Sequence, residues 1–358
     1  MTALVAQELA SIFPGTAVHE FGRGSTGLYH LFAVLRHLRG PGEVIIPSLC
    51  CETVALAAIF AGHRVRCADV DVERFCVSAA SVAAEINPNT RAVVVAHLFG
   101  LHADTQSFET LRRSTTGVVF VEDLAHAVGG RDHAGNDLGR GLDYAMFSFS
   151  PSKILGGSGG ALLGAEDREI FPRLAAQATQ HAPNANIGLL GLSLRNLVHS
   201  IADLHRSGSQ GAAKDLAKAM WLRFTPVVVE SGSFRDAQQA VIDLRRRDAI
   251  RAVRRTRAQR YRVGITHPGL RIPPFSAQET CWRVPVLAET PGLARRATAA
   301  LRAEGLHASN HYFPLHRLIC NAALPSAEYL GDRLLNLWVD ETITDHDLAA
   351  TCAILNSL

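Results

Sequence analysis

Short apolar runs alternate with amphipathic segments through the first half of the chain. The runs are continuous and rich in valine, which is typical of strands buried on both faces of a parallel sheet. We expect such strands at residues 43–47, 64–71, 92–97, 117–123 and 144–147. The intervening segments predict helices near residues 29–38, 53–61, 78–86 and 107–113. This order predicts an α/β fold in which helices cover both faces of a large, mainly parallel mixed sheet.

The C-terminal third follows a different pattern. Residues 241–262 predict one long helix with arginines at nine positions, followed by a connection at 268–276. We then expect strands at 282–287 and 306–312 and helices at 292–304 and 345–358. The chain therefore divides into a large domain, 1–240, and a smaller C-terminal α+β domain, 241–358. The helical stretch at 165–230 carries no motif.

Composition limits the partners that we expect. The 358 residues are 47% hydrophobic with a net charge of +3 and a pI near 8.5, so no overall field attracts nucleic acid or an anionic membrane. The arginine-rich helix could bind nucleic acid or phosphate, but only Tyr261 adds an aromatic ring to its charges, which favours a solvated helix face. No apolar run reaches about 18 residues and no basic leader precedes one, so we expect neither a membrane span nor export.

Cysteine usage indicates a reducing compartment. The seven cysteines are scattered and form no C-x-x-C pair, which fits free thiols better than a disulfide framework or a zinc site. We therefore expect a cytoplasmic protein without a metal centre.

A lone lysine stands between two apolar runs. Residues 144–163 read YAMFSFSPSKILGGSGGALL, with Lys153 near the middle and four glycines after it. Burial disfavours the charged form of an amine, so a lysine held between buried strands tends to lose its proton and become a nucleophile. The alternative is a surface lysine on an ordinary loop.

Small hydroxyl residues stand at the start of the helix predicted near residues 29–38. Residues 22–27 read GRGSTG, and Ser25 and Thr26 would combine hydroxyl donors with free backbone N–H groups at the positive end of a helix dipole, which suits a phosphate. An ordinary helix N-cap would use the same residues. The six residues also spell G-x-G-x-x-G, but residues 17–21 make a poor buried strand, so the context of a dinucleotide-binding fold is missing.

A carboxylate ends one of the predicted strands. Asp123 is the last residue of the run at 117–123, and ligands of parallel sheets lie beyond the carboxyl ends of the strands. The side chain could receive a proton, face a cation or cap the next helix, and its position alone leaves these choices open.

These features together meet the requirements of pyridoxal phosphate chemistry. A lysine must bond the cofactor aldehyde, an acid must keep the pyridine nitrogen protonated, and a hydroxyl-lined helix start must hold the phosphate. Lys153, Asp123 and the Ser25–Thr26 pair could fill those roles.

With these residues in place, the sequence resembles the DegT/DnrJ family of sugar aminotransferases, which are pyridoxal phosphate enzymes with the aspartate aminotransferase fold. The resemblance is closest from about residue 20 to residue 163. It is carried by an ordered set of motifs: GSTGL at 24–28, VIIPS at 44–48, AG at 61–62, DVD at 69–71, NPNT at 87–90, HLFG at 97–100, VEDLAHAVGG at 121–130, and FSF at 147–149 ahead of Lys153 and Gly159-Gly160. It returns more weakly at 231–240, at HYFPLH, 311–316, and at LP, 324–325.

The resemblance implies a role for each matching residue. Lys153 would be the Schiff-base lysine and the base that moves the substrate proton, Asp123 would pair with the pyridinium nitrogen, and His126 would contact the cofactor's phenolic oxygen. The hydroxyl residues that would bind the phosphate are Ser25, Thr26 and Ser148. The residues expected near the substrate mouth are His311, Tyr312 and His316.

Two positions depart from the family pattern. The family usually stacks an aromatic side chain on the cofactor ring, and the matching position here is Cys51, so stacking is lost or comes from elsewhere. The family also uses an Asn-aromatic-Arg triplet by which the neighbouring subunit contacts the phosphate, whereas this chain has Ser233-Phe234-Arg235. Ser233 would still donate a hydrogen bond to the cofactor, with a shorter reach, and we assign Arg235 to the substrate.

The resemblance therefore implies a homodimeric pyridoxal phosphate aminotransferase with its sites at the subunit interface. Glutamate would be the amino donor, and the acceptor would be a keto sugar, free or nucleotide-linked, or a related small ketone. One alternative is a binding or regulatory protein that keeps the cofactor but has lost transamination, as Cys51 and Ser233 would allow. The other is a nicotinamide oxidoreductase built on the glycines at 22–27.

Overall fold

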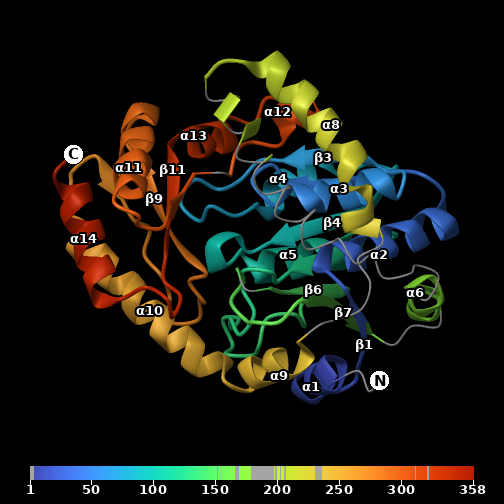
Figure 1. Cartoon of the computed structure of the whole chain (residues 1–358). Coiled ribbons are helices and arrows are strands. Elements are labelled where there is room, and N and C mark those ends of the chain that lie inside the picture. The colour runs from blue at the N-terminus through green and yellow to red at the C-terminus, as the bar shows by residue number, and fades with distance from the viewer. Residues whose placement is uncertain are drawn as a thin grey trace.

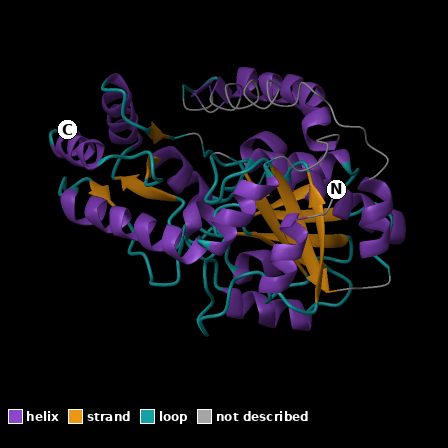
Figure 2. Cartoon of the chain, turned by 60° about the horizontal axis from the view of Figure 1, so that its bottom comes forward, coloured by secondary structure: helices purple, strands orange, loops and turns teal. Residues whose placement is uncertain are grey.

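The computed structural model describes residues 4–150, 152–165, 169–178, 197, 200–201, 203–204, 207–229, 236–310, 312–320 and 322–358. Two sheets lie apart from each other, and helices flank both of them (Figures 1 and 2). The larger sheet is built by the N-terminal half of the chain and the smaller one by the C-terminal third.

The larger sheet has seven strands in the order β1-β7-β6-β5-β4-β2-β3. Four neighbouring pairs, from β6 through β5, β4 and β2 to β3, are parallel, and β7 runs antiparallel to both β6 and β1. The strands are Thr16–Phe21 (β1), Glu43–Pro47 (β2), Arg64–Ala68 (β3), Thr90–Ala96 (β4), Val119–Asp123 (β5), Tyr144–Phe149 (β6) and Gly159–Ala165 (β7). Every residue of β2 and β5 is buried, as expected for strands covered on both faces.

Helices cover the larger sheet in layers. Helix α2 packs on β6 and β7, α3 packs on α2, and α8 lies over both helices (Figure 1). The helices of this part are Leu4–Ile12 (α1), Gly24–Arg39 (α2), Glu52–Phe60 (α3), Ala79–Glu85 (α4), Thr105–Ser114 (α5), Phe171–Ala178 (α6) and Gln210–Val229 (α8), with a short 3-10 helix at Leu98–Gly100. Their apolar faces and the central strands form one hydrophobic core.

The smaller sheet is antiparallel, in the order β10-β11-β9-β8, and has a hydrophobic core of its own. Its strands are Leu270–Arg271 (β8), Arg283–Ala288 (β9), Ala308–Ser309 (β10) and Leu334–Trp338 (β11). The helices of this part of the chain are Ala237–Arg245 (α9), Arg247–Gly264 (α10), Pro291–Ala303 (α11), His316–Ile319 (α12), Pro325–Arg333 (α13) and Asp345–Asn356 (α14). Of these, α9 packs on α1 and α12 packs on α8 and β3, whereas α10, α11 and α13 contact the smaller sheet. The predicted α/β class and large mixed sheet are confirmed, while the domain boundary near residue 240 stays a prediction.

Three details differ from the sequence analysis. The basic segment forms two helices that meet at Arg246, where one long helix was predicted, and Arg254 on the buried face of α10 is only 5% exposed. The strand expected at 306–312 is only two residues long. Residues 16–21 do form a strand, but at the edge of the sheet and antiparallel to β7. The glycines at 22–27 therefore do not follow a central parallel strand, which a dinucleotide-binding βαβ unit requires.

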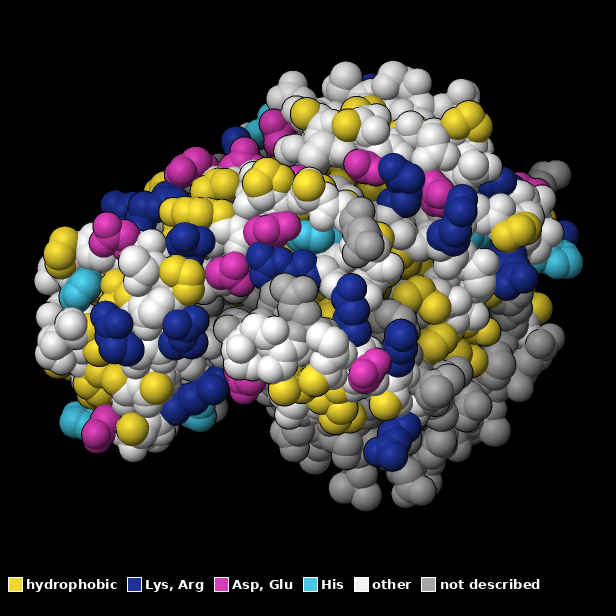
Figure 3. All heavy atoms as spheres, turned by 90° about the horizontal axis from the view of Figure 1, so that it is seen from above, with side chains coloured by type: hydrophobic (Ala, Val, Ile, Leu, Met, Phe, Trp, Pro, Cys, Tyr) yellow, Lys and Arg dark blue, Asp and Glu magenta, His cyan; other side chains and the backbone are white. Residues whose placement is uncertain are grey.

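One face of the molecule carries charges of both signs. Lys and Arg side chains alternate with Asp and Glu side chains over the face in Figure 3. Among the described helices, none combines the length and the apolar character needed to cross a bilayer.

Candidate active site

Lys153 lies on the turn that joins β6 to β7, and its backbone N–H donates to the Ser150 carbonyl at 2.9 Å. The amine Nζ lies 3.0 Å from His126 Nε2. Burial lowers the pKa of the Lys153 amine, negative charge at Cys51, Asp123 and Glu52 opposes that shift, and Arg283 adds to it. The turn thus holds an amine whose proton is easier to remove than that of a solvated lysine.

Asp123 ends β5 at the same edge of the sheet. In the parallel register, Asp123 pairs with Ala96 of β4 and Met146 of β6, so its carboxylate and the turn after β6 share the carboxyl edge. The side chain is 7% exposed and accepts a hydrogen bond from the Ala125 N–H at 2.9 Å. Burial raises the pKa of Asp123, while that hydrogen bond and the charge of Lys153 lower it. Asp123 and Lys153 therefore act on each other electrostatically across one site.

A buried histidine–glutamate pair, which the sequence analysis did not identify, lies beside Asp123. His97 Nε2 lies 2.9 Å from Glu122 Oε1, and its Nδ1 accepts the Ala103 N–H at 3.1 Å. An imidazolium at His97 would also lower the Asp123 pKa. The HLFG and VED motifs thus meet through side chains at the ends of β4 and β5.

His126 is held on several sides. Its Nε2 lies 3.0 Å from Lys153 Nζ and 3.3 Å from the Tyr312 hydroxyl, and the Trp282 indole stacks on the imidazole at 3.7 Å with 7° between the planes. The Thr280 hydroxyl donates to the His126 carbonyl at 2.9 Å. The C-terminal part of the chain therefore supplies three side chains that fix His126.

The turn before α3 forms another wall of the site. Cys51 is the N-cap residue of α3, and its Sγ lies 3.1 Å from the Thr53 hydroxyl. Burial and the charge of Glu52 raise the pKa of the Cys51 thiol to about 11. Burial also raises the pKa of Glu52, and the charge of Lys153 opposes this shift. Glu52 was not predicted, because nothing in its local sequence shows that it faces Lys153.

The start of α2 packs tightly against the β6–β7 pair. A Cβ on Gly24 would come within 3.2 Å of Ser148 Cβ, and a Cβ on Gly160 would come within 2.2 Å of the Gly24 nitrogen. Ser148 and Gly160 are register partners, so glycines bring the first turn of α2 against this point of the sheet. Thr26 is 3% exposed, and Ser25 and Ser148 are half-buried. The three hydroxyl residues predicted for the phosphate therefore lie on elements that touch one another.

The residues predicted to lie near the substrate do not lie together. Tyr312 is 6% exposed and lies against His126, whereas His316 is 2% exposed and lies between Ser48 and Glu328. His316 Nδ1 is 2.7 Å from the Ser48 hydroxyl, and its Nε2 is 3.1 Å from Glu328 Oε1. His316 thus joins α12 and α13 to the end of β2. His311, Ser233 and Arg235 lie outside the described residues.

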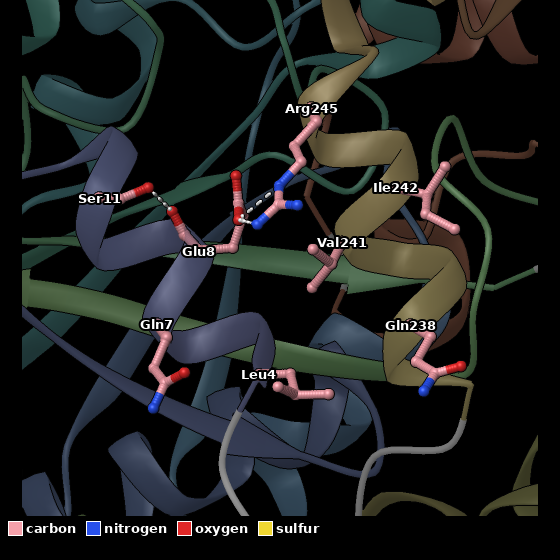
Figure 4. A pocket seen from close by; sticks show the side chains of 8 residues that line it. All are labelled: Leu4, Gln7, Glu8, Ser11, Gln238, Val241, Ile242 and Arg245. Atoms are coloured by element: carbon pink, nitrogen blue, oxygen red, sulfur yellow. Dashed lines mark hydrogen bonds and ion pairs between the residues drawn. The ribbon is translucent and has the colours of Figure 1, made fainter.

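A hollow of about 640 Å³ lies between α1 and α9. Figure 4 shows its lining, in which the Arg245 guanidinium meets the Glu8 carboxylate at 2.8 Å. It contains none of the predicted site residues. Within the described part of the chain, no group of three or more His, Cys, Asp or Glu side chains is arranged to hold a metal ion.

The comparisons with known proteins support the predicted family. Residues 18–183 match the model of the DegT/DnrJ/EryC1/StrS aminotransferase family, which confirms the resemblance predicted from the motifs. A UDP-N-acetyl-3-dehydro-α-D-glucosamine 3-aminotransferase from Acidithiobacillus ferrooxidans is 35% identical over 153 residues. That alignment covers 42% of this chain and 41% of the relative, so the match spans about two fifths of the relative's length.

Solved structures of aminotransferases share the fold. PseC of Helicobacter pylori, an aminotransferase involved in the biosynthesis of pseudoaminic acid, has a TM-score of 0.76 at 16% identity, covering 99% of this chain and 90% of that chain. The sugar aminotransferase CalS13 of Micromonospora echinospora has a TM-score of 0.73 at 22% identity, covering 99% and 92%. At these identities, the likeness establishes the fold alone.

Proposed function

We propose that this chain, residues 18–183 of which match the DegT/DnrJ/EryC1/StrS aminotransferase family, is a pyridoxal phosphate-dependent aminotransferase. The observation that carries the proposal is the meeting of Lys153, His126 and Asp123. The amine lies 3.0 Å from the imidazole and interacts with the carboxylate, at the carboxyl edge of a parallel sheet.

The donor set fits the cofactor. Lys153 offers an amine with a lowered pKa, Asp123 offers a buried carboxylate for a ring nitrogen, and the glycine-packed start of α2 offers N–H and hydroxyl groups for a phosphate. Bound pyridoxal phosphate would supply an aldehyde carbon and an electron-withdrawing ring. Ser25, Thr26 and Ser148 would hold the phosphate, and His126 would face the phenolic oxygen.

The chain's own residues would perform the proton chemistry. Lys153 Nζ would carry the proton that moves between substrate carbon and cofactor, with its lowered pKa leaving more free amine near neutral pH. Asp123 would keep the ring nitrogen cationic, because a buried carboxylate that gains a cationic partner returns to its charged form. His126, fixed by Trp282, would hold a proton beside the Lys153 amine.

The substrates are part of the proposal. We assign glutamate as the amino donor and a keto sugar, free or nucleotide-linked, or a related small ketone as the acceptor. The name of the Acidithiobacillus relative, a UDP-linked keto sugar aminotransferase, supports the nucleotide-linked form. Tyr312, whose hydroxyl is 3.3 Å from His126, would contact the substrate, as would His311 and Arg235. His316 would act through Ser48 and α13.

The assembly and the location stay predictions. We propose a homodimer in which Ser233 of each chain reaches the cofactor of the other. All seven cysteines are free, in keeping with the proposed cytoplasmic location.

The test is a two-step assay on protein loaded with pyridoxal phosphate. Glutamate should convert the cofactor to its pyridoxamine form with release of 2-oxoglutarate. A panel of UDP-linked, dTDP-linked and free keto sugars should then restore the original absorbance for the true acceptor class. The second candidate, a cofactor-binding protein without transamination, is favoured by the departure at Cys51. It predicts cofactor loading without conversion by glutamate.

A further inference from the structure

Trp282 joins the two chain segments that carry the reactive side chains. It directly precedes β9 and is 5% exposed. The indole N–H donates to the Ser152 carbonyl at 2.7 Å, one residue before Lys153. The indole face stacks on His126 with ring centroids 3.7 Å apart. One side chain from the C-terminal part therefore contacts both the turn of Lys153 and the imidazole.

The stacking fixes the direction in which His126 Nε2 points. An imidazole can turn about its terminal torsion, which is broad for a ring joined to an sp³ carbon. A parallel indole at 3.7 Å removes that freedom, because turning the imidazole would drive its edge into the indole face. His126 Nε2 therefore stays directed at Lys153 Nζ and at the Tyr312 hydroxyl, 3.0 and 3.3 Å away.

The indole also lies close to the lysine amine itself. Lys153 Nζ is 5.2 Å from the Trp282 ring centroid, within the roughly 6 Å over which an aromatic face attracts a cation. This attraction favours the ammonium form and so opposes the effect of burial. The other groups that act on the amine are Cys51, Asp123 and Glu52, which favour the charge, and Arg283, which disfavours it.

We propose that Trp282 is a positioning residue for the Lys153–His126 pair, which holds the imidazole plane, anchors the backbone beside the lysine and stabilises the lysine ammonium through its indole face. The contacts that support it are independent of any cofactor. Its meaning for catalysis rests on the proposed aminotransferase function, in which Lys153 alternates between free and charged amine.

The chain offers a direct readout of this role. It contains only three lysines, and Lys214 and Lys218 are both exposed on α8. Formaldehyde with cyanoborohydride methylates only neutral amines, so the pH dependence of methylation at each lysine, followed by peptide mass spectrometry, reports its titration. Lys214 and Lys218 serve as internal standards in the same cofactor-free sample.

Trp282→Leu removes both the face and the N–H, and Trp282→Phe keeps a smaller face. In Trp282→Leu, the pH midpoint of the Lys153 titration should fall by roughly half a pH unit to one pH unit. This corresponds to about three- to tenfold faster methylation of Lys153 at a fixed pH below the midpoint. Trp282→Phe should give a smaller shift in the same direction. In loaded enzyme, kcat should fall about tenfold or more with KM little changed.

Trp338→Phe is the matched control. The Arg283 guanidinium carbon lies 3.8 Å from the Trp338 ring centroid and 4.8 Å from the Trp282 ring centroid, so both rings stack on the same cation. Trp338 has no described contact to His126. The control variant should leave the Lys153 midpoint in place. A folded Trp282→Leu protein whose midpoint stays unchanged, or rises because water enters, would overturn the inference. Failure of the aminotransferase function would instead appear as wild-type protein that binds no pyridoxal phosphate, whatever the methylation profile.

Discussion

Gly160→Ala should displace the start of α2, where the cofactor phosphate is proposed to bind. A Cβ built on Gly160 lies 2.2 Å from the Gly24 nitrogen, 2.4 Å from the Arg23 carbonyl carbon and 2.5 Å from the Gly24 Cα. All three are backbone atoms, so no flexible side chain can turn aside. Since ordinary contacts of a Cβ begin near 3.4 Å, the first turn of α2 must move by about 1 Å away from β7.

The energetic cost follows from that displacement. Forcing one methyl group into a packed interior costs about 1–3 kcal/mol, so Gly160→Ala should unfold several degrees below wild type. The same shift moves Ser25 and Thr26 away from Ser148, so the protein should bind pyridoxamine phosphate about tenfold or more weakly. Pyridoxamine phosphate suits this assay because it has no aldehyde to bond Lys153, and tryptophan fluorescence can follow the titration.

Gly292→Ala on α11 is the control, because a Cβ there would meet only Arg296 Nη1 at 3.7 Å and Thr290 Oγ1 at 3.8 Å, both ordinary contact distances. It should match or slightly exceed wild type in stability, since alanine favours a helix over glycine by roughly 1 kcal/mol. Gly160→Ala protein with wild-type melting and wild-type affinity for pyridoxamine phosphate would refute the assigned packing of α2 against β7.

Three further predictions concern the charged groups of the site. Lys153→Ala should remove the visible absorbance of the loaded protein and all turnover, and a variant that keeps both would exclude Lys153 as the bonding amine. Asp123→Asn should lower transamination by about 10²- to 10³-fold yet raise the melting temperature of the cofactor-free protein at pH 7. The rise in melting temperature follows because burial raises the pKa of Asp123, so the folded state loses stability as the pH rises through that pKa. The amide of the Asp123→Asn variant cannot ionise, so the variant avoids this loss. Scanning calorimetry at pH 4 and pH 7 should therefore show a larger gain in melting temperature for Asp123→Asn at pH 7. Glu52→Gln should lower the Lys153 pKa by removing a charge that raises it, and methylation of Lys153 that is slower at a fixed pH than in wild type would contradict the assigned electrostatic interaction.

The sequence predicts the parts of this fold that depend on local pattern. Continuous apolar runs locate β2 and β5 closely, because strands covered on both faces need no polar positions. In a parallel sheet the carboxyl ends of the strands lie at one edge, so the sequence alone predicts that Asp123 and the turn of Lys153 lie close together. Strand β10 was predicted too long: Asn310 and Tyr312 are also buried, but of the described residues in this run only Ala308 and Ser309 pair with β11.

The contacts around His126 lie beyond local sequence. Trp282 and Tyr312 reach His126 across more than 150 residues, and only the packing of β9 and the loop before α12 against the larger sheet brings them there. Glu52 likewise reads as an ordinary acidic residue at a helix start, and only the fold turns it toward Lys153. The one available signal for these contacts was Trp282 itself, because the indole N–H of a buried tryptophan needs a hydrogen-bond acceptor.

The most direct test of the account is to identify the lysine that bonds the cofactor. Protein incubated with pyridoxal phosphate, reduced with borohydride and digested should carry the cofactor's mass on the Lys153 peptide, with Lys214 and Lys218 unmodified at stoichiometric cofactor. Reduction after prior addition of glutamate should leave Lys153 unlabelled. Label distributed over the two α8 lysines, or Lys153 labelled equally with and without glutamate, would contradict an aminotransferase centred on Lys153.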